Sequence, residues 1–280
     1  MITRTNEKCI KEEIEILQKI KHENLIGYKM YQFHMDPHTG FSYVDIVMDL
    51  CDGTLEDYLD DRTKYTKFDP LLIMKHCANG LHYLHNECTR TIIHKDIKPT
   101  NILLCNLDTK TKLADFGISR TLADDVTSFS NTHSCTEQWA APEVLDMSSD
   151  TKVRPSVDIF SLGCVYYYLL TRKHPFDGAL VTNSKLLTPK DFTKRKRHII
   201  NGDVCQFSKK ITSYTVKDLI KTMIKRNPEM RYTSHEIKNH PTFLTSREKI
   251  TFICQLKNKL HDQSGEKLLT ELNKYKGAVS

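Results

Sequence analysis

The apolar residues of the chain follow helical spacing over most of its length and strand spacing in one early region. Within residues 7–20, isoleucine and leucine recur every three or four positions with charged residues between them, which predicts an amphipathic helix. Residues 28–33 and 43–48 then predict two strands, separated by a turn at 36–40 that contains proline and glycine. The beginning of the chain is therefore expected to fold as helix, strand, strand.

Helical patterns dominate the rest of the sequence. The expected helices cover residues 54–59, 71–85, 156–171, 215–226 and 234–239, and the Ser- and Thr-rich stretch 115–140 is expected to be a loop. The most apolar stretch, 157–170, contains Asp158 and Ser161 and is too short to cross a bilayer, so it predicts a buried core helix. The pattern predicts an α+β chain with a small strand-containing part and a large, mainly α-helical part.

Composition adds few functional constraints. The 280 residues are 39% hydrophobic and 27% charged, which is typical of a globular protein. Much of the net charge of +6 comes from Lys190 and the run 194–197, which we interpret as a solvated loop without a function of its own. The nine cysteines form no CxxC pair and no apolar signal sequence opens the chain, which favours reduced thiols and a cytoplasmic location.

Three short motifs carry the candidate chemistry. They are HKDIKPTNILL at His94–Leu104, ADFG at Ala114–Gly117 and AAPE at Ala140–Glu143. Phosphoryl transfer requires a base near the acceptor hydroxyl, oxygen ligands for Mg²⁺ and a cation beside the transferred group. Asp96, Lys98, Asn101 and Asp115 are residues of these types. Mg²⁺ keeps part of its coordination for phosphate oxygens, so Asn101 and Asp115 would supply enough protein ligands.

These motifs, in this order, resemble the eukaryotic protein kinase superfamily over about residues 7–244. The resemblance implies a bilobal protein-kinase-like fold and transfer of the ATP γ-phosphate to protein hydroxyls, with ATP and Mg²⁺ as cofactors. It implies that Asp96 accepts the hydroxyl proton, that Lys98 contacts the moving phosphoryl group and that Asn101 and Asp115 hold the metal. Lys98 followed by Pro99 is similar to the Ser/Thr form of this loop, so the implied substrate is a protein serine or threonine.

Further landmarks of the resemblance assign other roles. Glu13 lies where the family has the glutamate of helix C, Met48 lies at the gatekeeper position, and the hinge that meets adenine through its backbone consists of Asp49, Leu50 and Cys51.

The resemblance also assigns residues that support the site. Asp158 is expected to be buried and to bind the backbone of the catalytic loop, and His94 is expected to be packed rather than to act as a base. Glu143 at the end of the activation segment is expected to pair with Arg231.

The runs 135–143 and 158–167 resemble one kinase subgroup more closely, the one that contains the inositol-requiring enzyme of the unfolded-protein response and ribonuclease L. Trp139, the single tryptophan of the chain, is the most specific mark of this likeness. The kinase domain is predicted to cover residues 1–244. The remaining residues, 245–280, are predicted to form a helical tail that resembles the start of the ribonuclease module of that subgroup.

The sequence departs from the family in its first residues. None of the ten glycines is spaced as GxGxxG, and no strand lysine is placed to face Glu13. We therefore expect a truncated small lobe with two strands and helix C, and weaker binding of ATP.

Three interpretations stay open. The first is a Ser/Thr protein kinase, which could phosphorylate a sister chain, and the second is a catalytically weak or silent regulatory module that dimerises. The third, a nuclease, is the weakest, because the tail is too short for a ribonuclease module and no nucleic acid partner is expected without one. We expect ATP, a protein substrate and a homodimer as partners. No direct membrane contact is expected, although the chain could be the cytosolic part of a membrane-anchored protein.

Overall fold

The computed structural model describes residues 11, 14–35, 38, 42–105, 109–116, 135–146, 153–177, 188–251 and 254. The chain divides into two compact units, Met1–Lys238 and Asn239–Ser280. The predicted boundary after residue 244 stays a prediction. No helix among the described residues is both long and apolar enough to cross a membrane.

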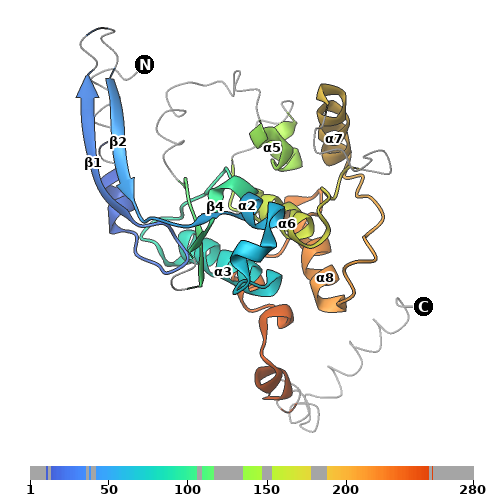
Figure 1. Cartoon of the computed structure of the whole chain (residues 1–280). Coiled ribbons are helices and arrows are strands. Elements are labelled where there is room, and N and C mark those ends of the chain that lie inside the picture. The colour runs from blue at the N-terminus through green and yellow to red at the C-terminus, as the bar shows by residue number, and fades with distance from the viewer. Residues whose placement is uncertain are drawn as a thin grey trace. The chain divides into compact units, whose positions relative to one another are not determined.

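The first predicted strands form as expected, and so does the described part of the predicted helix 7–20. Strand β1 (Tyr28–Met35) pairs antiparallel with β2 (Ser42–Met48) in a two-stranded sheet (Figure 1). Residues 14–19 are helical, and Ile14 and Leu17 are each only 1% exposed. The helix also contacts the sheet through Gln18, whose Nε2 donates to the Lys29 carbonyl at 3.1 Å. The amphipathic helix therefore covers apolar surface that a lone hairpin would leave in water.

A second sheet, which the sequence pattern did not predict, lies in the same unit. Its strands are β3 (Gly53–Thr54), β4 (Ile102–Cys105) and β5 (Lys110–Leu113), paired antiparallel in that order. The chain just before β1 joins it, because the Ile26 N–H donates to the Leu113 carbonyl at 2.9 Å and the Leu113 N–H donates to the Asn24 carbonyl at the same distance. Strands of two to four residues are too short to produce a recognisable alternation.

Helices form the larger part of the described chain. They are α2 (Leu55–Asp60), α3 (Pro70–His82), α5 (Pro142–Leu145), α6 (Ser156–Thr171), α7 (Pro189–Asn201), α8 (Tyr214–Met223) and α9 (Ser234–Lys238). Helix α6 contacts both α3 and α8 and is buried along nearly its whole length, as predicted for an apolar core helix (Figure 1). A π-helical turn, Tyr83–Glu87, follows α3 and extends it close to the predicted end at residue 85.

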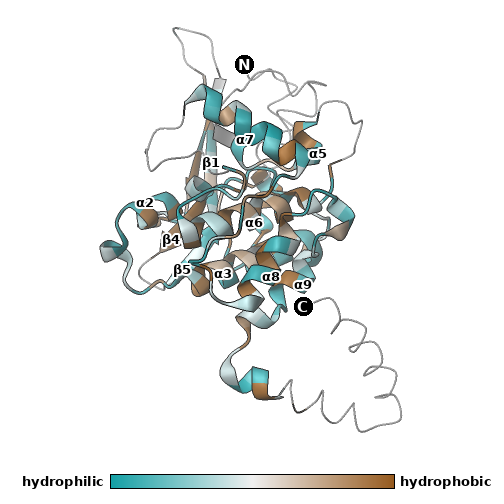
Figure 2. Ribbon diagram, turned by 90° about the vertical axis from the view of Figure 1, so that its right-hand side faces the viewer, coloured by the Kyte–Doolittle hydropathy of each residue, from teal (hydrophilic) through white to brown (hydrophobic). Residues whose placement is uncertain are grey.

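The basic run at 194–197 lies in a helix, so its interpretation as a solvated loop was wrong. It belongs to α7, which begins with a capping box between Thr188 and Asp191 and which is mainly hydrophilic in Figure 2. The side chain of Arg195 is buried, and it occupies the helix face that also carries the buried Ile199. The hydrophobic pattern did not predict this helix, because Arg195 occupies a buried position where an amphipathic helix usually has an aliphatic residue.

The expectation of reduced thiols throughout was wrong for one pair. Cys51 and Cys105 are joined by a disulfide, with their Cα atoms 4.6 Å apart. The pairing of Gly53 with Leu104 in the β3–β4 ladder brings these two cysteines together, although 54 residues separate them in the chain. Contacts made by strand pairing cannot be read from cysteine spacing.

The second unit is described only at its beginning. A helix starts after Thr245, whose hydroxyl accepts the Glu248 N–H at 3.2 Å while Glu248 Oε2 accepts the Thr245 N–H at 2.7 Å. This reciprocal capping box is typical of a helix N-terminus. The remainder of the predicted helical tail lies outside the described residues.

Candidate active site

The backbone of the loop that contains Asp96 is held by a buried carboxylate from α6. Asp158 is 1% exposed, and its two oxygens accept the backbone N–H groups of His94 and Lys95, each at 2.8 Å. The predicted role of Asp158 is thus confirmed. Sequence reasoning missed one further partner, His85, whose Nε2 lies 2.9 Å from Asp158 Oδ2, because 73 residues separate the two. Satisfying both oxygens in this way offsets the cost of burying the charge.

His94 is packed into the core, as predicted. It is 1% exposed, its ring contacts that of Phe116 edge-on at 6.0 Å, and its Nδ1 accepts the Asp96 N–H at 3.4 Å. Burial lowers the pKa of the imidazole, with nearby carboxylates opposing the shift. The ring is therefore neutral at physiological pH and supports the Asp96 backbone.

The candidate catalytic residues lie together. Asp96 Oδ2 accepts a hydrogen bond from Asn101 Nδ2 at 2.9 Å and lies 2.8 Å from Lys98 Nζ. Its other oxygen, Oδ1, is buried and has no hydrogen-bond partner in the described part of the chain. A 3₁₀ turn, Pro99–Asn101, creates this arrangement, since it folds Asn101 back so that its amide also donates to the Asp96 carbonyl at 2.9 Å. One carboxylate oxygen is thus held in place, and the other is buried without a partner among the described residues.

The second candidate metal ligand is linked to the first through the backbone. The Ala114 N–H donates to the Asn101 carbonyl at 2.9 Å, which places Asp115 one residue beyond this contact. Asp115 is exposed and has a φ of 60°, a left-handed conformation that aspartate tolerates better than most residues. The next side chain, Phe116, is fully buried and packs edge-on against Tyr28 at 5.8 Å. The Asp115 carboxylate and the Phe116 ring therefore take up opposite environments, exposed and buried.

These residues fit a magnesium ion by their chemistry. The amide nitrogen of Asn101 is used by Asp96, which leaves its carbonyl oxygen available, and Asp115 adds an exposed carboxylate. Hard oxygen donors in this small number suit Mg²⁺ that shares its coordination with phosphate. No cluster of three or more His, Cys, Asp or Glu side chains that could hold a metal occurs among the described residues. Any magnesium site here would therefore need oxygens from the nucleotide or from water.

The predicted hinge follows β2 and connects to β4. Met48 ends β2 and is 37% exposed, and Leu50 is 95% exposed. Cys51 is bonded to Cys105, and the Asp52 N–H donates to the Leu104 carbonyl at 2.9 Å. Because β4 follows Asn101 directly, the hinge and the candidate metal ligand attach to the same strand.

The side chain of Asp49 is directed to other partners. It accepts the Gly27 N–H at 3.0 Å and pairs with Lys29 Nζ at 2.7 Å and Lys112 Nζ at 3.1 Å. A Cβ atom at Gly27 would lie 2.7 Å from Asp49 Oδ2, so the contact requires glycine. Burial alone would raise the pKa of the Asp49 carboxyl, but the hydrogen bonds from Lys29, Lys112 and Gly27 outweigh it and hold the pKa below its usual value. The Asp49 N–H donates to the Gly27 carbonyl at 2.9 Å, so the backbone carbonyl is the polar group of Asp49 that remains for contact with a nucleotide.

A cavity of about 510 Å³ adjoins this ion-paired group. Its lining includes Gln18, Ile20, Lys21, His22, Leu25, Gly27, Tyr28, Lys29, Asp49 and Lys112. None of the residues grouped around Asp96 contributes to it, so we do not assign the chemistry to this cavity.

The end of the segment that begins at Asp115 is fixed by an ion pair, as predicted. Arg231 Nη1 and Nη2 donate to the two Glu143 carboxylate oxygens at 2.7 and 2.8 Å. The Arg231 side chain is 0% exposed, and it also donates to the carbonyls of Lys225, Arg226 and Ser156. A bidentate pair with its remaining donors satisfied is the favourable form of a buried salt bridge.

One predicted site residue could not be placed. Glu13 lies outside the described residues, as do residues 117–134, which include most of the Ser- and Thr-rich loop. The assignments of Asp96, Lys98, Asn101, Asp115 and the hinge stay predictions about function, although the structure brings the first four together.

Comparison with known proteins gives the same picture. The family model of the protein kinase domain matches residues 2–243. The chain is 28% identical over 270 residues to the human serine/threonine-protein kinase/endoribonuclease IRE2, which is 93% of this chain and 27% of that protein. It is 29% identical over 255 residues to the Caenorhabditis elegans serine/threonine-protein kinase/endoribonuclease ire-1, which is 86% of this chain and 24% of that protein.

A third relative comes from another kinase group. The Drosophila melanogaster mitogen-activated protein kinase kinase kinase 7 is 34% identical over 178 residues, which is 61% of this chain and 24% of that protein. The chain thus spans about a quarter of the length of these curated relatives. Since the family model covers nearly all of the first unit, with its mixed α and β elements and short sheets, the chain belongs to the protein kinase domain family.

Proposed function

We propose that this chain is a Ser/Thr protein kinase that transfers the γ-phosphate of ATP to protein hydroxyls. The observation that carries the proposal is the state of the Asp96 carboxylate. Its Oδ2 is occupied by Lys98 and Asn101, whereas its Oδ1 has no hydrogen-bond partner among the described residues. A buried carboxylate oxygen without a partner is able to accept the proton of a hydroxyl once a bound substrate reaches it.

The remaining residues support this reaction in separate roles. Asn101 and Asp115 would hold Mg²⁺, which neutralises phosphate charge when bound. Lys98, 2.8 Å from Asp96, would contact the transferred phosphoryl group, and the backbone of residues 48–51 would meet adenine. Because little covalent chemistry falls to the protein in phosphoryl transfer, positioning is its main contribution. The Asp158 contacts with His94 and Lys95 would provide that positioning for the catalytic loop.

The likeness to kinase/endoribonucleases extends the proposal. We propose autophosphorylation between sister chains in a homodimer, a cytoplasmic location and a place in the unfolded-protein response. Glu13 would serve as the helix C glutamate. We propose no nuclease activity and no nucleic acid partner for residues 1–280.

Transfer of labelled phosphate from Mg·ATP tests the proposal on the whole 280-residue chain. The unaltered chain should label itself or a generic Ser/Thr protein, and Asp96→Asn and Asp115→Ala should each abolish labelling. Asp203→Asn, at an exposed aspartate two residues beyond the end of α7, is the matched control and should label normally. Phosphopeptide mapping should find phosphoserine and phosphothreonine, and phosphotyrosine alone would contradict the assignment of substrate class.

A second candidate function is a catalytically silent regulatory module. It is favoured by one observation, that none of the ten glycines in the printed sequence is spaced as GxGxxG. A chain that shows no transfer above the Asp96→Asn level, but that binds ATP and changes its association state on doing so, would support this candidate instead.

A further inference from the structure

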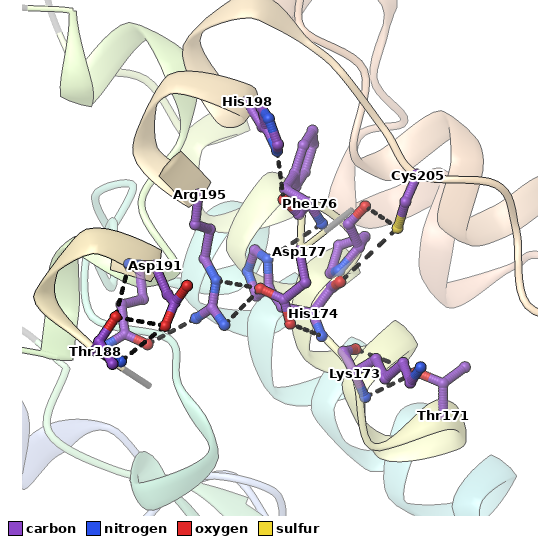
Figure 3. Close-up of polar contacts among 12 residues, drawn as sticks. Thr171, Lys173, His174, Phe176, Asp177, Thr188, Asp191, Arg195, His198 and Cys205 are labelled. Carbon is purple, nitrogen blue, oxygen red and sulfur yellow. Dashed lines mark hydrogen bonds and ion pairs between the residues drawn. The ribbon is translucent and has the colours of Figure 1, made fainter. Parts of the chain in front are cut away.

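The loop before α5 is attached to α7 by the side chain of Arg195. Arg195 Nη1 donates to Gln138 Oε1 at 2.7 Å. Its Nε donates to Asp177 Oδ1 at 2.6 Å (Figure 3). The side chains of Arg195 and Asp177 are only 6% and 8% exposed, so the ion pair is largely shielded from water. A second and more exposed pair joins Lys196 Nζ to Glu137 Oε2 at 3.2 Å. Two consecutive loop residues are therefore bound by two consecutive residues of α7.

Asp177 is itself held in place by the turn that follows α6. Its Oδ2 accepts the His174 N–H at 3.1 Å, which leaves Oδ1 directed at Arg195 (Figure 3). The ring of Trp139, next to Gln138, packs edge-on against His174 at 5.0 Å and against Tyr168 of α6 at 5.4 Å. The loop thus rests on α6 through Trp139 and on α7 through Arg195.

Helix α7 is firmly positioned to serve as this support. The buried Ile199 lies on its inner face, and His198 Nδ1 lies 3.0 Å from the Phe176 carbonyl (Figure 3). Its N-terminus is fixed by the capping box of Thr188 and Asp191. A side chain from a helix fixed at both ends can hold a loop more precisely than a contact between two loops.

Residues 137–140 belong to the segment between Asp115 and Glu143, and the bidentate pair of Glu143 with Arg231 is the other fixed point of this segment. We infer that Arg195 is a positioning residue for the protein substrate: it holds Gln138 on α7, and residues 137–140, ordered in this way, would bind the substrate whose hydroxyl reaches Asp96. The inference rests on the proposed kinase function. A loop that is ordered before binding does not pay the cost of ordering when substrate arrives, so loss of the contact should weaken substrate binding rather than the chemical step.

Gln138→Ala is the first test, because it removes the loop's side of the contact while Arg195 keeps its partner Asp177. In steady-state phosphorylation of a serine peptide, its KM for the peptide should rise about fivefold or more, with kcat and the KM for ATP within about twofold of the unaltered chain. Lys194→Gln, at an exposed position of α7, is the control and should change none of the three. An unchanged peptide KM in Gln138→Ala would overturn the inference.

A second variant distinguishes the role of Arg195 from an alternative explanation, that Gln138 itself contacts the substrate. The double variant Asp177→Asn with Arg195→Gln removes the same attachment without altering the loop sequence and leaves no buried charge unpaired. It should reproduce the rise in peptide KM, and a folded double variant with an unaltered KM would show that Arg195 positions nothing.

Hydrogen exchange keeps the two proposals apart. Amides of residues 137–141 should exchange faster in Gln138→Ala than in the unaltered chain, whereas those of α6 should not change. If the unaltered chain transfers no phosphate, the proposed function fails and the substrate role of Arg195 fails with it. The attachment of the loop to α7 would still be judged by exchange, and equal exchange in both proteins would overturn that part.

Discussion

Asp158 and His94 are 64 residues apart in the chain, yet Asp158 Oδ2 accepts the His94 N–H at 2.8 Å in the interior of the protein. The same carboxylate also binds the Lys95 N–H and His85. One buried side chain of α6 therefore fixes the backbone of the two residues that precede Asp96. Lys95 has a φ of 66°, a conformation that costs a non-glycine residue energy and that persists only when its surroundings enforce it. The placement of the candidate base therefore depends on a residue that does not belong to the candidate reaction centre.

Replacing Asp158 should be strongly destabilising. Asp158→Ala leaves two backbone N–H groups and His85 without their acceptor in a region closed to water, at about 1–3 kcal/mol for each unsatisfied group. We expect a loss of about 3 kcal/mol or more in the free energy of unfolding, measured by urea denaturation, and a smaller loss for Asp158→Asn, which keeps one acceptor oxygen. The exposed Asp203→Asn is the control, with an expected change within about 0.5 kcal/mol. Equal stabilities of Asp158→Ala and the control would contradict this account.

Removing one partner of the buried pair Glu143–Arg231 should cost much more stability than removing one partner of an exposed ion pair. Glu143→Ala leaves the fully buried Arg231 guanidinium with three backbone carbonyls but no counter-charge, at a cost of about 3–5 kcal/mol. The ion pair of Arg154 with Glu229 is exposed on both sides, so Glu229→Gln should cost less than about 1 kcal/mol. Parallel denaturation curves of the two variants check this, and a cost for Glu143→Ala as small as that of Glu229→Gln would refute it.

Much of the site could be predicted because its residues lie in contiguous motifs. Asp96, Lys98 and Asn101 fall within six positions of one another, and a short turn suffices to bring them together. The helix 156–171 was predicted with its observed bounds, since a long apolar run with interspersed small residues admits few other structures. The pairing of Glu143 with Arg231 could be predicted only through the likeness to a family, as 88 residues separate them.

The parts that could not be predicted depend on long-range contacts. The strands β3, β4 and β5 are too short for a periodic signal, and their pairing brings Cys51 to Cys105. Helix α7 was not predicted because its inner face carries a charged residue, Arg195. Burial of Arg195 is possible through its ion pair with Asp177, which the local sequence does not reveal. The sequence shows that Arg195 is charged and therefore costly to bury. The ion pair that offsets this cost can be seen only in the folded structure.

Acid should destabilise the protein through its buried histidines. Burial, aided by the charge of the adjacent Arg195, holds the pKa of His174 well below its usual value. Above about pH 6.5 this histidine is neutral in both the folded and the unfolded chain. Below that pH the unfolded chain takes up a proton that the folded chain refuses, so the free energy of unfolding falls, by up to about 1.4 kcal/mol per pH unit for one group.

Substitution of His174 tests the sign of this dependence. His174→Phe removes the titrating group and should give a shallower fall in unfolding free energy between about pH 6.5 and pH 5. His94, whose pKa is also lowered by burial, would account for part of the slope that remains. Thr193→Ala, which replaces an exposed residue of α7 that does not titrate, should leave the slope as it is. An identical slope in His174→Phe and the unaltered chain would contradict the prediction.

Gly163 in the middle of α6 should tolerate no larger side chain. A Cβ atom at this position would lie 2.7 Å from the Cβ of Met223 and 2.8 Å from Cγ2 of Ile224, at the contact between α6 and α8. Because the Met223 Cβ is attached directly to the backbone, rotation of a side chain cannot relieve the clash and the two helices must move apart. Gly163→Ala should therefore lower the free energy of unfolding by about 1–3 kcal/mol, despite the better helix propensity of alanine. Thr193→Ala, exposed on α7, should change it by less than about 0.5 kcal/mol. Thermal or urea denaturation of both variants decides the matter, and a Gly163→Ala protein as stable as the unaltered chain would mean that α6 and α8 are packed less closely than described.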